Sequence, residues 1–166
     1  RAAVPAGQST EEVVQRMASI FIPYYDAHKC DFTRPYDGIP GMLKTITAAG
    51  VRLAVASNKY QDGAEKLVHH FFGEYDFVRI LGQREGQPIK PDPAIVDQVL
   101  AEVPSVTKSE TVYVGDSNVD MQTGLNAGVR TVGVSWGFRT REELAAYSPS
   151  AIVDTPEELS RVILGA

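Results

Sequence analysis

The stretch Val112-Tyr113-Val114-Gly115-Asp116-Ser117-Asn118-Val119-Asp120 decides the fold of this chain. Its short apolar run predicts a buried strand, and Gly115 lets the backbone turn sharply after it. Ser117 opens a predicted helix, which ends at Gly128 because glycine suits a left-handed C-cap. Asp116 therefore falls at the carboxyl end of a strand, where open α/β sheets place their ligands.

Two carboxylates four residues apart indicate a cation site at this edge. Asp116 and Asp120 both supply hard oxygen ligands, and Mg²⁺ is held by one or two carboxylates while it keeps several waters. A second interpretation of Asp120 is equally open, because Ser117-x-x-Asp120 fits a capping box at a helix start. Asp116 is harder to explain structurally, since a strand-end carboxylate needs a partner once it is buried.

Composition limits the class of protein. The chain has 166 residues, 43% of them hydrophobic, and a net charge of −5, which together suit one domain with a small addition. Charges of both signs are interspersed with no basic stripe, so we expect no nucleic-acid partner. No apolar run approaches membrane-spanning length, so we expect no membrane partner. Cys30 is the one cysteine, which excludes an internal disulfide and favours a reducing cytoplasm.

The organisation of the chain changes near residues 33–38. Before this boundary, Ser9-Thr10-Glu11-Glu12 offers a capping box, and apolar residues follow at helical spacing up to a predicted kink or break near Pro23. After it, apolar strands alternate with amphipathic helices. This alternation predicts a doubly wound, mainly parallel α/β sheet.

Polar residues follow a second predicted strand. The run Val51–Ala56 reads as a buried parallel strand, and Ser57, Asn58 and Lys59 come directly after it. The Ser57 hydroxyl, with free backbone N–H groups at a helix start, is suited to hold a phosphate. The alternative is that Ser57 or Asn58 merely caps the helix that follows, and local sequence favours it.

A lysine lies on a rigid segment before a third helix. In Lys90-Pro91-Asp92-Pro93, Pro91 keeps Lys90 out of helical geometry, Asp92 is the predicted N-cap and Pro93 the first helical residue. Most lysines are solvated surface residues. The prolines on either side of Asp92 make a positioned ammonium more plausible here.

Taken together, these three motifs resemble the haloacid dehalogenase-like hydrolase superfamily, and within it the phosphoglycolate phosphatase group. Further support comes from Pro35-Tyr36-Asp37-Gly38-Ile39-Pro40 and Val134-Ser135-Trp136-Gly137. The resemblance extends from Tyr36 to about Ile163. It implies a Rossmann-like hydrolase core over residues 36–166, and it makes residues 1–35 the remnant of a helical cap domain.

The resemblance also implies roles for individual residues. Ser57 matches the phosphate-binding hydroxyl, and Asn58, beside it in the same motif, is expected to bind the substrate together with Ser57 and Lys90. Lys90 matches the lysine that neutralises phosphate and nucleophile. Asp116 matches the Mg²⁺ ligand and Asp120 the acidic position that supports the metal site. The implied activity is a Mg²⁺-dependent phosphatase of small phosphorylated metabolites.

One departure from the family pattern is large. The family's first motif, Asp-x-Asp-x-Thr, carries the nucleophile on the central strand, and this chain has no two aspartates separated by a single residue. The missing strand belongs between the strands Val51–Ala56 and Val112–Val114, where its loss exposes backbone groups on both neighbours. We therefore expect an upstream segment to supply the strand and the nucleophile, and we expect this chain alone to be inactive.

Two other functions stay open from the sequence. One is a non-catalytic module that keeps the fold and binds phosphate or metal. The other is a phosphonate hydrolase, dehalogenase or sugar-phosphate mutase on the same scaffold. A dehalogenase needs no Mg²⁺, so the pair of Asp116 and Asp120 argues against that member of the group.

Overall fold

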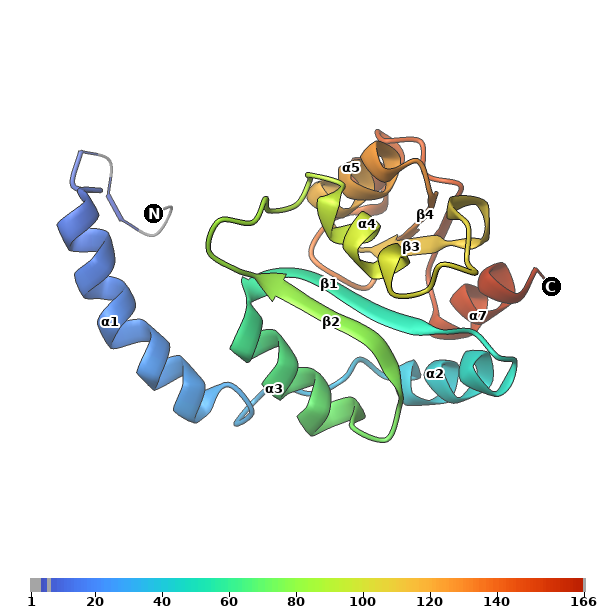
Figure 1. Ribbon diagram of the computed structural model, residues 1–166, viewed down its shortest axis with the longest axis horizontal. Helices are drawn as coiled ribbons and strands as arrows, with labels where there is room; N and C mark the ends of the chain where they lie inside the picture. Colours follow the sequence, from blue (N-terminus) through green and yellow to red (C-terminus); the bar gives the residue numbers. More distant parts are fainter. Residues whose placement is uncertain (1–3, 6, 166) are drawn as a thin grey trace. The chain divides into compact units, whose positions relative to one another are not determined.

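The computed structural model describes residues 4, 5 and 7–165 and divides the chain into two compact units, one ending at Arg34 and the other beginning at Pro35. Residues 1–3, 6 and 166 of the two predicted domain ranges lie outside the described residues. The interpretation of the first unit as a cap remnant stays a prediction. Figure 1 traces the path of the chain.

The first unit is built on one helix, α1 (Glu11–His28). Its N-cap is Thr10, whose hydroxyl accepts a hydrogen bond from the backbone N–H of Val13 at 3.3 Å, so the cap lies one residue after the predicted Ser9. The helix continues through Pro23 without the predicted break. No residue of α1 is buried, and large apolar side chains such as Ile20 and Phe21 are exposed.

The second unit alternates helices and strands, as the sequence predicts. Its elements are α2 (Ile39–Ala48), β1 (Leu53–Tyr60), α3 (Gln61–Phe72), β2 (Phe77–Gln83), α4 (Ala94–Ala101), η1 (Lys108–Glu110), β3 (Val112–Gly115), α5 (Asn118–Ala127), β4 (Arg130–Val134), α6 (Arg141–Ala145), β5 (Ala151–Val153) and α7 (Pro156–Leu164).

All strand pairs are parallel, which confirms the predicted α/β class. The strands form two sheets, however, with the orders β1-β2 and β3-β4-β5. Figure 1 shows β1 beside β2 and, apart from them, β3 beside β4. In the described part of the chain no strand pairing joins β1 to β3. The break falls at the position where the family pattern places the central strand that this chain lacks.

Three apolar clusters stabilise the second unit. One joins Leu81 of β2 to residues of α4 and α5, a second joins β4 and β5 to Leu159 of α7, and a third joins α2 to Leu53 of β1. Val132 of β4 is fully buried, and burying a side chain of that kind contributes about 1.5–3 kcal/mol. The helices therefore hold the strands, and with them the polar strand ends, in fixed positions.

Two element boundaries differ from the prediction near the candidate residues. Strand β1 runs on to Tyr60, so Ser57 and Asn58 lie within the strand rather than after it. Helix α4 begins at Ala94, with Pro93 as its N-cap. The N-cap thus lies one residue after the predicted Asp92, although the Asp92 side chain still accepts a hydrogen bond from the N–H of Ala94 at 2.9 Å.

Candidate active site

Asp116 lies between the last residue of β3, Gly115, and the N-cap of α5, Ser117. Ser117 caps α5 by accepting a hydrogen bond from the N–H of Asp120 at 3.3 Å, and Gly128 ends the helix at φ 68°, both as predicted. The Asp116 side chain is half-buried. Its Oδ2 accepts a hydrogen bond from the N–H of Phe138 at 3.0 Å, and its carbonyl accepts one from the N–H of Arg139 at 3.2 Å.

Lys90 forms a buried ion pair with Asp120. Its Nζ lies 2.7 Å from Asp120 Oδ1, and each side chain is only 11% exposed. The same ammonium donates to the carbonyl of Ala56 at 3.0 Å. The predicted positioned ammonium is therefore present, and the alternative of a solvated surface lysine does not describe it.

Asp120 is surrounded by donors. Its Oδ2 accepts from the Ser117 hydroxyl at 2.6 Å, and its Oδ1 accepts from the Tyr113 hydroxyl at 3.5 Å as well as from Lys90. Burial raises the pKa of Tyr113 well above its usual value, and the negative charge of Asp120 adds to the rise. Both Asp120 oxygens are thus engaged by protein donors, and its predicted metal role stays a prediction.

Asn58 contacts Lys90 rather than a helix start. Its Nδ2 donates to the Lys90 carbonyl at 3.1 Å, and its Oδ1 accepts from the Lys90 N–H at 2.9 Å. Ser57 Oγ accepts from the N–H of Lys59 at 3.1 Å. Helix α3 has Tyr60 as its N-cap and no side-chain cap, so the interpretation of Ser57 or Asn58 as a helix cap is wrong.

The carboxylate of Asp116 suits a hard cation. Among the described residues, Oδ1 of Asp116 has no hydrogen-bond partner, while Oδ2 is fixed by Phe138. One fixed carboxylate with a free oxygen matches the way Mg²⁺ is bound, through one or two carboxylates and several waters. Within the described part of the chain, no group of three or more His, Cys, Asp or Glu side chains forms a complete metal cage. Asp116 therefore fits as one ligand of a mostly water-bound ion.

The structure brings most of the predicted residues into one connected set. Ala56, next to Ser57, bonds to Lys90, Lys90 bonds to Asp120, and a Cβ added to Gly115 would lie 2.9 Å from Oδ2 of Asp120. Asp116 directly follows Gly115. The roles assigned to these residues in phosphate and metal binding stay predictions.

Three contributors to the site were not predicted from the sequence: Tyr113, the carbonyl of Ala56 and the N–H of Phe138. The first two lie on strands that were correctly predicted, but nothing local indicates which of their groups face Lys90 and Asp120. A signal for the third was available, because Gly137 follows a strand and a glycine there indicates close backbone approach.

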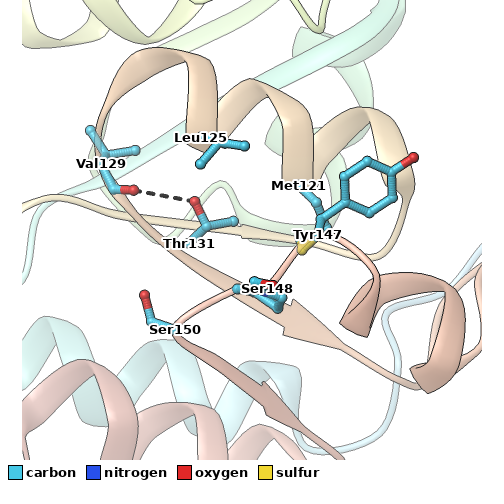
Figure 2. A pocket seen from close by; sticks show the side chains of 8 residues that line it. Met121, Leu125, Val129, Thr131, Tyr147, Ser148 and Ser150 are labelled. Carbon is cyan, nitrogen blue, oxygen red and sulfur yellow. Dashed lines mark hydrogen bonds between the residues drawn. The ribbon is translucent and has the colours of Figure 1, made fainter.

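A separate cavity lies at the opposite end of the strands. It has a volume of about 100 Å³ and is lined by residues that include Met121, Thr131, Tyr147 and Ser150 (Figure 2). Thr131 is near the beginning of β4, and Ser150 precedes β5, whereas Asp116 follows the end of β3. This cavity is therefore distinct from the candidate active site.

Comparisons with known proteins agree on one family. The family described as haloacid dehalogenase-like hydrolase matches residues 4–134. A phosphoglycolate phosphatase of Psychrobacter arcticus is 30% identical over 98% of this chain and 70% of its own length. A pyrophosphatase, PpaX, of Halalkalibacterium halodurans is 26% identical over 92% of this chain and 70% of its own length.

A solved structure extends the similarity to three dimensions. A protein of Lactobacillus delbrueckii subsp. bulgaricus, provisionally named a phosphoglycolate phosphatase, is 37% identical and superposes with a TM-score of 0.85. The match covers 95% of this chain and 65% of that one. These similarities support the expectation of a phosphoric monoester hydrolase.

Among the described residues, no helix combines the length and apolar character needed to cross a bilayer.

Proposed function

Because the chain belongs to the haloacid dehalogenase-like hydrolases, we propose that it is the carboxyl-terminal portion of a Mg²⁺-dependent phosphatase of small phosphate monoesters. The observation that carries the proposal is the ammonium of Lys90, buried and fixed by Asp120 and by the carbonyl of Ala56. A phosphoryl group carries negative charge throughout its transfer, so a fixed cation beside it lowers the barrier.

Each residue has a part in this reaction. Lys90 holds a positive charge near the phosphoryl oxygens, and Asp120 keeps it oriented. Ser57 contributes a hydroxyl on β1 for a phosphate oxygen. Asp116 would hold Mg²⁺ through its carboxylate, with Asp120 as the supporting acid nearby. The bound ion supplies further neutralisation of phosphate charge.

The nucleophile is proposed to come from an upstream segment. An aspartate on a central strand would attack the phosphorus and expel the alcohol, and water would then hydrolyse the aspartyl-phosphate. The break between β1 and β3 supports this proposal. Exposure supports it too: Val114 of β3 is 37% exposed, whereas residues 131–134 of β4, which is paired on both sides, are buried.

A second candidate is a non-catalytic module that binds phosphate or metal. Within these 166 residues no Asp-x-Asp motif occurs, which favours this candidate for the chain taken by itself. Another hydrolase or a mutase on the same scaffold remains a further alternative.

For location we propose the cytoplasm, supported by the single Cys30.

Phosphate release tests the proposal. The full-length protein, this chain and full-length Lys90→Ala are assayed with Mg²⁺ against phosphoglycolate, pyrophosphate and several sugar phosphates. We expect turnover by the full-length protein, none by this chain, and a loss of roughly 10²–10³ in kcat for Lys90→Ala. Steady turnover by this chain alone would contradict the aspartyl-phosphate mechanism. Inactivity of the full-length protein on every ester would favour the non-catalytic module.

Calorimetry tests the metal separately. Titration of the full-length protein with MgCl₂ should give a binding signal that Asp116→Ala abolishes. An unchanged signal in this variant would remove Asp116 from the metal site.

A further inference from the structure

We propose that Asn58 is a positioning residue for Lys90 and not a ligand of the substrate. This inference rests on the proposed function. It replaces the substrate-binding role that the motif shared with Ser57 implies for Asn58. It depends on the two hydrogen bonds between the Asn58 amide and the Lys90 backbone, at 2.9 and 3.1 Å, which we call the Asn58 clamp.

The clamp uses both ends of the amide. The Lys90 N–H needs an oxygen acceptor and the Lys90 carbonyl needs an N–H donor, so only one orientation of the Asn58 side chain satisfies them. An aspartate of the same shape lacks the donor, and a leucine lacks both groups. The position therefore selects asparagine for its contact with Lys90.

The clamp holds one end of Lys90, and Ala56 holds the other. Asn58 bonds to the backbone of Lys90, while the carbonyl of Ala56, two residues earlier on β1, accepts from Nζ. A lysine has a flexible four-carbon stem, so fixing both its backbone and its tip restricts where the charge lies. Ser57 lies between the two attachment points, so the clamp sets the position of the ammonium relative to the Ser57 hydroxyl.

The clamp also connects distant parts of the sequence. Residues 58 and 90 are separated by α3, β2 and the loop after β2. That loop ends in Lys90, which β1 holds through Asn58 and Ala56. Without the clamp, Lys90 keeps its ion pair with Asp120 but loses the attachment that fixes its backbone. A misplacement of about 1 Å in a catalytic group can cost on the order of 10²-fold in rate.

A double-mutant cycle in the full-length protein tests the inference. The proteins are wild type, Asn58→Ala, Lys90→Ala and the double variant, assayed for kcat and KM on the best ester of the panel. We expect Asn58→Ala to lower kcat roughly 10- to 100-fold with little change in KM. In the Lys90→Ala background the same change should alter kcat less than about twofold, because Asn58 acts through Lys90. Equal losses in both backgrounds, or a rise in KM alone, would show a direct contact with substrate.

Asn126→Ala is the matched control. Asn126 donates to the carbonyl of Pro91 at 3.0 Å, so it also bonds to the segment that carries Lys90, but not to Lys90 itself. We expect its kcat to stay within about twofold of wild type. Melting curves verify that each variant is folded, and Asn58→Ser, whose hydroxyl is too short to span both Lys90 groups, replaces Asn58→Ala if the latter does not fold.

A measurement independent of activity separates this inference from the proposed function. In ¹⁵N-labelled protein, loss of the clamp should speed hydrogen exchange at the Lys90 amide and shift the signal of its ammonium nitrogen. Wild-type exchange and an unshifted ammonium in Asn58→Ala would overturn the inference, whether or not the protein is a phosphatase. Inactive wild-type protein with the expected exchange would overturn only the proposed function.

Discussion

Gly137 lies directly against the carboxylate of Asp116. A Cβ added to Gly137 would come within 2.5 Å of Asp116 Cγ, which no real side chain accommodates without displacement. The next residue, Phe138, donates its N–H to Asp116 Oδ2 at 3.0 Å. The absence of a side chain at position 137 therefore allows the backbone to approach and orient the proposed metal ligand.

The first prediction follows from this contact. Gly137→Ala should weaken Mg²⁺ binding by the full-length protein about 10- to 100-fold, as losses of supporting contacts around a metal ligand typically do. Titration calorimetry measures it. Gly41→Ala is the control, because Gly41 has nothing within 4 Å of an added Cβ. Phe138→Ala keeps the donating N–H and should bind as wild type. Equal affinity in Gly137→Ala would remove this loop from the metal site.

The second prediction concerns stability. Asp120→Ala leaves the Lys90 ammonium buried without its partner, so we expect the free energy of unfolding to fall by about 3–5 kcal/mol. Asp97→Ala is the matched control, since Asp97 pairs with Lys108 where both side chains are half-exposed, and such pairs contribute about 0–1 kcal/mol. Urea unfolding of the full-length protein compares the two variants. If both variants lost a similar free energy of unfolding, burial would not make the Lys90–Asp120 pair more important for stability than the Lys108–Asp97 pair.

The third prediction concerns alkaline pH. The pKa of Tyr113 is raised in the folded state by burial and by Asp120. Above the unfolded pKa of about 10, the unfolded state therefore binds fewer protons than the folded state, and stability falls as pH rises. The slope from this residue is at most about 1.4 kcal/mol per pH unit, and Tyr113→Phe should remove it. Denaturant unfolding at a series of pH values gives the slope, with Tyr36→Phe, an exposed tyrosine, as control.

The fourth prediction concerns acid pH. The hydroxyl of Ser135, foremost, and the nearby Arg141 hold the pKa of Asp154 below its usual value. Because the folded pKa is the lower one, this carboxylate favours folding above the unfolded pKa and loses that contribution as pH falls through the folded pKa. Ser135→Ala should raise the pKa, as followed by the carboxyl carbon signal of Asp154 in NMR. Ser109→Ala, in the distant η1, should not change it, and an unchanged value in Ser135→Ala would exclude the hydroxyl as the cause.

The sequence predicts what local physics determines. The caps of α5 at Ser117 and Gly128 were correctly predicted because each depends on a few neighbouring residues. Contacts such as Asn58 with Lys90, or Phe138 with Asp116, join residues 32 and 22 positions apart. Side-chain type alone does not determine such pairs. They arise only after strands and loops pack. The sequence therefore predicted Asn58 to bind the substrate or to cap a helix, and not to contact Lys90.

The boundary of β1 illustrates the same limit. Ser57, Asn58 and Lys59 are polar, and local sequence favours a strand end there. The regular pairing of β1 with β2 is interrupted after Ala56 and returns where Tyr60 pairs with Gln83, so the strand extends to Tyr60. The return of pairing at Tyr60 depends on β2, which local sequence does not show. The shift of the α4 start by one residue, from Pro93 to Ala94, is of the size that end effects commonly produce.

The two sheets and Lys90 together imply a mechanical coupling. No strand pairing holds β1 to β3 in the described residues, yet Nζ of Lys90 bonds both to a carbonyl of β1 and to the helix that follows β3. Lys90 therefore links the sheet β1-β2 to the side of the sheet β3-β4-β5 by hydrogen bonds, alongside the apolar contacts of Leu81 with α4 and α5. A central strand inserted between β1 and β3, as proposed for the upstream segment, would enter a gap that Lys90 already spans.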